Sequence, residues 1–193
     1  MSDENFITNY FSSVGKVINN LDEHKEKIID IINKIRLCNE NENKVLVAGN
    51  GGSCADAEHF AGELVCTFND RNRKGISAIP LATHPAALTA WSNDFGFDGI
   101  FARQIETLGE ENDLLICYST SGSSKNILEA ALEAKRKKMT VLSFTGNSKN
   151  NKLAEISSSS FLAPSSKTAF IQELHTIVGH EVCLAVEQLM SKK

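Results

Sequence analysis

The chain has 193 residues, of which 41% are hydrophobic and 23% charged, and its formal net charge is −4. This length suits one domain with one substantial core. The acidic balance argues against nucleic acid or an anionic membrane surface as the main partner, because either would favour a basic face. No apolar run approaches the roughly 18 residues of a membrane span and no hydrophobic leader follows the acidic start, so we expect a cytoplasmic protein. The five cysteines form no C-x-x-C pair and are expected to be free thiols.

Helical and strand patterns follow one another along the chain. Residues 3–39 predict two helices, because apolar side chains recur there at helical spacing. From residue 44 onward, short apolar runs rich in β-branched residues alternate with helical stretches, and the runs span residues 44–49, 76–81, 113–119, 140–146 and 160–164. Such strands separated by helices indicate a parallel sheet covered on both faces. We therefore predict an α/β fold, a three-layer αβα sandwich with a five-stranded, mainly parallel sheet. Residues 1–193 form one domain in this prediction, with residues 1–39 as an N-terminal helical extension and a long last helix over residues 169–190.

Two of the predicted strands lead into helices through small polar residues. The first turn follows residues 44–49 and contains Asn50, Gly51, Gly52 and Ser53. The carboxyl ends of parallel strands bind ligands, and glycines, hydroxyls and helix N-terminal amides together suit a phosphate. The alternative interpretation is an ordinary helix cap, because serine favours that position. For Ser53 the two interpretations are equally good.

The second turn is richer in hydroxyl groups. It follows residues 113–117 and carries five hydroxyl side chains around one glycine: Ser119, Thr120, Ser121, Ser123 and Ser124. A single cap needs one hydroxyl rather than five, so this turn favours a phosphate site. Its spacing fits neither a Walker A loop nor a dinucleotide-binding fingerprint.

Candidate catalytic groups lie in two predicted helices. His59 and Glu63 are four residues apart in the helix that Ser53 opens, so they share one face with an axial rise of about 6 Å. Gln172, His175 and His180 lie in the last helix. A lone histidine is more often a surface or packed core residue than a catalytic one, and we interpret His24 and His84 in that way.

The order of these motifs resembles one known family. The chain reads GNGGS, then H-F-A-x-E, N-D-F-G-F, S-T-S-G-x-S, I-Q-E-x-H and a final histidine. Over roughly residues 40–190 it resembles the phosphoheptose isomerases of the sugar-isomerase (SIS) family. The resemblance implies the SIS fold and an aldose–ketose isomerase that converts D-sedoheptulose 7-phosphate to D-glycero-D-manno-heptose 7-phosphate through an enediol. That reaction is the first step of nucleotide-activated heptose synthesis for lipopolysaccharide or capsule.

The same resemblance implies roles for individual residues. Glu63 resembles the general base of the family and His180 its general acid. The implied substrate contacts are Asn50, Gly51, Gly52, Ser53, Glu63, Asn93, Asp94, Ser119, Thr120, Ser121, Ser124 and Gln172. One zinc ion per subunit is implied at His59, Glu63, Gln172 and His180. Such a metal could polarise substrate oxygens, although binding to zinc weakens a carboxylate as a base.

Two departures from the family pattern leave the exact sugar open. Thr67 stands where an arginine often follows the helix glutamate by four residues, and Ala169-Phe170 stands where Asp-Arg or Ala-Arg is common. An isomerase of another phosphosugar is therefore one alternative. A non-catalytic SIS protein that binds a replication initiator is another, and a bare phosphosugar-sensing module is a third. The presence of both Glu63 and His180 favours an enzyme.

Spacing in the last helix bears on assembly. Gln172 and His180 are separated by about 12 Å of helix, more than their side chains comfortably close around one ion. Either the helix is irregular near Gln172, or these residues serve sites made with another subunit. We therefore expect a symmetric oligomer with active sites at its interfaces, so that an isolated monomer has an incomplete set of catalytic groups and is inactive. The resemblance implies a homotetramer.

Overall fold

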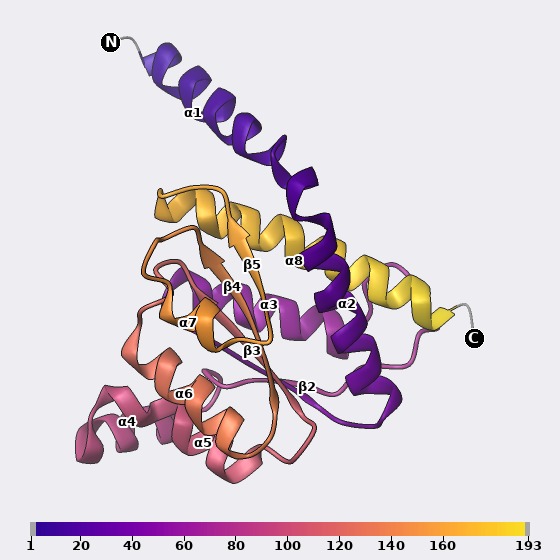
Figure 1. Cartoon of the computed structure of the whole chain (residues 1–193), viewed down its shortest axis with the longest axis vertical. Coiled ribbons are helices and arrows are strands. Elements are labelled where there is room, and N and C mark those ends of the chain that lie inside the picture. The colour runs from indigo at the N-terminus through magenta and orange to yellow at the C-terminus, as the bar shows by residue number, and fades with distance from the viewer. Residues whose placement is uncertain (1–2, 192–193) are drawn as a thin grey trace.

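The structure is a computed structural model that describes residues 3–191. Helix α1 (Asp3–Ile18) extends away from the body of the molecule, and a short 3₁₀ helix, η1 (Leu21–His24), joins it to α2 (Lys25–Glu40), which packs beside the sheet (Figure 1). Apolar side chains of α1 face solvent, and Phe6 and Phe11 are 68% and 69% exposed. The predicted N-terminal helical extension is therefore present, with an apolar surface that the rest of the chain leaves uncovered.

The sheet has five strands in the order β2-β1-β3-β4-β5, and all neighbouring pairs are parallel. The strands are β1 (Val45–Gly49), β2 (Ala78–Pro80), β3 (Leu114–Ser119), β4 (Thr140–Gly146) and β5 (Ser159–Ala163). This confirms the predicted α/β sandwich, with a sheet that is wholly parallel. Strand β2 is short and lies at an edge, where a strand tolerates Pro80, which has no backbone N–H to donate.

Helices cover both faces of the sheet (Figure 1). The remaining helices are α3 (Gly52–Val65), α4 (Pro85–Phe95), η2 (Phe97–Gly99), α5 (Ile100–Leu108), α6 (Lys125–Arg136), α7 (Lys152–Ile156) and α8 (Thr168–Ser191). Side chains of α2, α3 and α8 form one apolar core with the sheet, and those of α5, α6 and α7 form a second core on the opposite face. Among residues 3–191, the helices lack the combined length and apolarity needed to cross a membrane.

The strand order creates a crevice between the neighbouring strands β1 and β3. The chain leaves β1 into α3 on one face of the sheet and leaves β3 into α6 on the other, as the two separate cores show. Helices that diverge to opposite faces after adjacent parallel strands leave a crevice at the carboxyl ends of those strands, where ligands bind in such sheets. Both polar turns predicted from the sequence lie at this crevice.

Candidate active site

The first turn, between β1 and α3, depends on glycine. Gly51 has a φ of +56°, a conformation that side chains with a Cβ rarely adopt. A Cβ on Gly52 would overlap the amide of Gln172, which reaches the turn from α8. Ser53 is buried in the first turn of α3. The predicted contacts Asn50 to Ser53 thus lie together, and Gln172 joins them.

The second turn, between β3 and α6, keeps its hydroxyls within one another's reach. Ser119 Oγ accepts a hydrogen bond from the Gly122 N–H at 3.2 Å and lies 3.4 Å from Ser124 Oγ. Ser121 Oγ accepts hydrogen bonds from the backbone N–H and the hydroxyl of Ser123. Ser124 is the N-cap residue of α6, yet its side chain makes no capping hydrogen bond. The helix cap therefore does not explain these hydroxyls, which favours the phosphate interpretation.

The two turns are tied to each other. Asn50 and Asn126 exchange two side-chain hydrogen bonds of 2.8 Å, one in each direction. Beside the second turn lies a hollow of about 330 Å³, which Thr120 and Ser121 line together with Ser165 and Ser166 of the β5–α8 connection and Thr168 at the start of α8. This hollow offers a hydroxyl-rich wall to a phosphorylated ligand.

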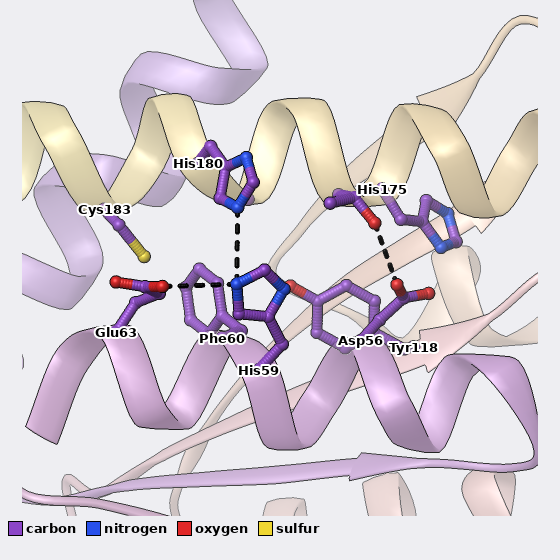
Figure 2. A pocket seen from close by; sticks show the side chains of 10 residues that line it. Asp56, His59, Phe60, Glu63, Tyr118, His175, His180 and Cys183 are labelled. Atoms are coloured by element: carbon purple, nitrogen blue, oxygen red, sulfur yellow. Dashed lines mark hydrogen bonds and ion pairs between the residues drawn. The ribbon is translucent and has the colours of Figure 1, made fainter. Parts of the chain in front are cut away.

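A narrow cleft lies between α3 and α8, and Figure 2 shows side chains of both helices directed into it. His59 Nε2 lies 3.2 Å from Glu63 Oε1 and 3.4 Å from His180 Nε2. Glu63 and His180 therefore meet across His59 within a single chain. They do so because α8 runs directly alongside α3, while the expected oligomer with sites at its interfaces stays a prediction. The enclosed part of the cleft measures only about 10 Å³, which is room for about one water molecule.

Asp56 and Thr176 also line this cleft, and neither was predicted from the sequence as a site residue. Asp56 Oδ1 accepts a hydrogen bond from Thr176 Oγ1 at 3.0 Å, while Asp56 Oδ2 is buried and has no hydrogen-bond partner among residues 3–191. Burial raises the pKa of Asp56, against smaller opposing effects of Thr176 and His59. The sequence did carry a signal for Asp56, because it shares a helix face with His59 and Glu63 at spacings of three and seven residues. The contribution of Thr176 depends on how α8 crosses α3, which spacing does not reveal.

The cleft and the hydroxyl-rich turn are built on the same strand and the same helix. Tyr118 lines the cleft, and the next residue in β3 is Ser119. Helix α8 likewise borders both places, because Thr168 lines the hollow while His175 and His180 line the cleft. Strand β3 and helix α8 therefore run past both the hydroxyl groups and the Glu63–His59–His180 row.

Other predicted residues lie outside this cluster. Asn93 and Asp94 are exposed on α4, where their side chains bond to each other at 2.8 Å, and within the described range no hydrogen bond links either one to the two turns. His24 packs against the ring of Phe161 at 5.5 Å, and His84 accepts the N–H of Ala87 at the start of α4. Both histidines thus have structural roles.

The predicted zinc ligands fit only in part. His59, Glu63 and His180 adjoin one another, but Gln172 packs on Gly52 at the first turn instead. Over residues 3–191, no set of three or more His, Cys, Asp and Glu side chains is arranged to hold a metal ion. Instead, Glu63 and His180 each contact His59, which lies between them. The residues as placed do not fit the four-ligand site, so we derive no chemical step through a metal.

Comparison with known proteins gives one consistent result. Residues 9–146 match the SIS domain family. The phosphoheptose isomerase of Helicobacter pylori (strain ATCC 700392 / 26695) is 46% identical over 154 residues, which cover 80% of this chain and 79% of the relative. That of Burkholderia pseudomallei (strain K96243) is 50% identical over 144 residues, covering 75% and 72%. The structure of a phosphoheptose isomerase from Francisella tularensis superposes with a TM-score of 0.92 at 34% identity, over 97% of this chain and 100% of that chain. The chain therefore belongs to the SIS domain family and, within it, to the phosphoheptose isomerases.

Proposed function

We propose that this protein interconverts D-sedoheptulose 7-phosphate and D-glycero-D-manno-heptose 7-phosphate. The observation that carries the proposal is the meeting of Glu63 and His180 across His59, in a cleft that shares β3 and α8 with the hydroxyl-rich turn. A phosphorylated ketose needs these two features side by side, one to hold its phosphate and one to move a proton at its other end. The relatives named above are isomerases of this kind.

The reaction moves a proton between C1 and C2 through an enediol, so it needs a base at carbon and an acid at the carbonyl oxygen. Glu63 removes the proton from carbon, and His180 donates a proton to the oxygen. His59 lies between them, and its Nε2 contacts both side chains. The Glu63 side chain is 25% exposed, so substrate can reach it from the mouth of the cleft.

The phosphate binds at the second turn in this proposal. The hydroxyls of Ser119, Thr120, Ser121 and Ser124 and the N-terminus of α6 supply donors there. The first turn and Gln172 contact the carbon chain of the sugar. Asn93 and Asp94 remain predicted substrate contacts from α4.

Four further expectations about this protein remain predictions. One zinc ion per subunit has the adjacency of His59, Glu63 and His180 in its favour. A homotetramer is supported by the exposed apolar face of α1. A cytoplasmic location, and a product that feeds lipopolysaccharide or capsule synthesis, follow from what the family does.

The decisive experiment is to incubate the purified protein with sedoheptulose 7-phosphate and follow the loss of ketose. A Glu63→Gln variant should keep the fold and lose about 10²–10⁴-fold in kcat, the usual contribution of a general base. Glu58→Gln is the matched control, because Glu58 is exposed on the same helix and lies outside the cleft. Near-full turnover by Glu63→Gln would assign the base to another residue. Faster turnover of a pentose or hexulose phosphate would overturn the heptose assignment.

A further inference from the structure

The loop that follows α3 is organised around one buried carboxylate. Glu187, near the end of α8, is only 3% exposed. It accepts hydrogen bonds from the backbone N–H groups of Phe68, Asn69 and Asp70 at 2.9, 2.7 and 2.8 Å. It also accepts one from Arg73 Nε at 3.0 Å. A carboxylate with four such donors binds the loop tightly to α8.

Arg73 connects this carboxylate to the helix that carries the proposed base. Its Nη2 donates to the carbonyl oxygen of Glu63 at 2.8 Å, and its Nη1 donates to that of Leu64 at 3.0 Å. Both carbonyls lie in the last turn of α3, where a helix has no partners of its own for its final C=O groups. The guanidinium also places positive charge at the negative end of the helix dipole. Arg73 therefore completes the turn that bears Glu63.

The pair spans the two helices that supply the proposed base and acid. Glu63 is on α3, and His180 is on α8, seven residues before Glu187. Seven residues are about two helical turns, so His180 and Glu187 lie on one face of α8, about 10 Å apart along its axis. The side chains of Arg73 and Glu187 are 3% and 4% exposed, so water competes little with their contacts.

From this arrangement we infer that Arg73 and Glu187 are positioning residues for the isomerase, a clamp that fixes the last turn of α3 against α8 and so holds Glu63 opposite His180. The inference rests on the proposed function for its link to turnover. Neither residue touches the cleft. Their effect is on geometry, and a displacement of about 1 Å in a reacting group can cost about 10²-fold in rate.

The test compares Arg73→Ala, Arg73→Lys and Glu187→Gln with the wild type, each assayed well below its own thermal midpoint. We expect kcat to fall about 10- to 100-fold in Arg73→Ala and KM for sedoheptulose 7-phosphate to stay within about twofold, because the phosphate turn is untouched. Lysine can pair with Glu187 but lacks the fork that reaches two carbonyls. Compared with Arg73→Ala, the Arg73→Lys variant should therefore regain more of the lost thermal midpoint than of the lost kcat.

Asp113→Asn is the matched control. Asp113 is also a buried carboxylate that accepts two backbone N–H groups, from Lys44 and Glu110, and pairs with a cation, Lys44 Nζ at 2.6 Å. It lies at the start of β3, at the end of the sheet away from the cleft. The control should lose stability and keep kcat. Equal losses of kcat in Asp113→Asn and Glu187→Gln, or an unchanged kcat in folded Arg73→Ala, would overturn the inference.

Hydrogen exchange of residues 60–70 separates this inference from the proposed function. We expect faster exchange there in Arg73→Ala than in the wild type, with the strands still protected. If the wild type does not act on sedoheptulose 7-phosphate, the proposed function fails, and the exchange measurement still decides whether the clamp holds the turn of Glu63. Unchanged exchange in that segment would show that it does not.

Discussion

His175 shows how far surroundings set the chemistry of one residue. The ring is fully buried among aromatic side chains, with centroids 5.6, 6.0 and 6.3 Å from those of Tyr118, Phe144 and Phe161. Neither ring nitrogen has a hydrogen-bond partner of ordinary geometry. Burial lowers the pKa of His175 to about 4, against a weaker opposing effect of the Thr145 backbone. The imidazole is therefore neutral near pH 7, and the inner end of the cleft stays free of positive charge.

This pKa predicts a stability change in mild acid. The unfolded chain binds a proton at His175 near pH 6.5, whereas the folded protein binds it only near pH 4. The free energy of unfolding should therefore fall as pH drops through this window, by about 3 kcal/mol from this residue. A His175→Leu variant should lack that part of the decrease, which denaturant titrations between pH 7 and pH 4 would measure. A constant difference in unfolding free energy between variant and wild type across this range would contradict the prediction.

Single residues also mark what the sequence could and could not reveal. His59 and Glu63 were predictable as a pair because one helix fixes their spacing. Their contact with His180 depends on the crossing of α3 and α8, which no local pattern encodes. Phe170, which stands where an arginine is common in the family, is buried with its ring 5.3 Å from that of Tyr10, so it helps hold α1 on α8.

At the scale of elements, strands were predicted better than short helices. All five strands lie within the predicted apolar runs, give or take a residue, because buried parallel strands are apolar along their whole length. Helix α7, over Lys152–Ile156, falls in a segment whose polar start resembles a loop. It begins there because Asn151 Oδ1 accepts the N–H of Ala154. Tertiary contacts rather than helical periodicity support so short a helix.

The β3–α6 turn gives the prediction at this scale. Replacing Ser119, Ser121 and Ser124 together by alanine should raise KM for sedoheptulose 7-phosphate at least about tenfold, since each hydrogen bond to a charged group contributes about 1.5–3 kcal/mol. The thermal midpoint should change little, because the Ser124 side chain does not cap α6. Ser123→Ala is the control, as its hydroxyl bonds only to Ser121 in the described structure. An unchanged KM in the triple variant, measured by steady-state kinetics, would place the phosphate elsewhere.

At the scale of the whole molecule, each chain brings together Glu63 and His180, the proposed base and acid. The row of Glu63, His59 and His180 is complete within one subunit, whatever the number of subunits. What an oligomer could add is a cover for α1 and a partner for the exposed Asn93 and Asp94.

Subunit mixing tests this arrangement. Glu63→Gln and His180→Ala proteins can be mixed under conditions that exchange subunits. Because Glu63 and His180 of one site lie in the same chain, every site in the mixed oligomers still carries one of the two substitutions. Activity should therefore equal the sum of the two parents. Native mass spectrometry of differently tagged chains would verify that exchange has occurred. Recovered activity in verified mixed oligomers would show that the acid and base of one site come from different chains.

The position of α8 has a consequence for how the protein is made. The core on one face of the sheet joins side chains of α2 and α3 to those of α8, including Ile31, Phe60 and Val182. Synthesis proceeds from the N-terminus at roughly 5–20 residues per second, so about 100 residues, or roughly 5–20 seconds, separate α3 from α8 on the ribosome. During that interval the nascent chain exposes the apolar face of α3 to its surroundings. Helix α8 also carries His180, so its docking on α3 completes this core and brings His180 to Glu63 in one event.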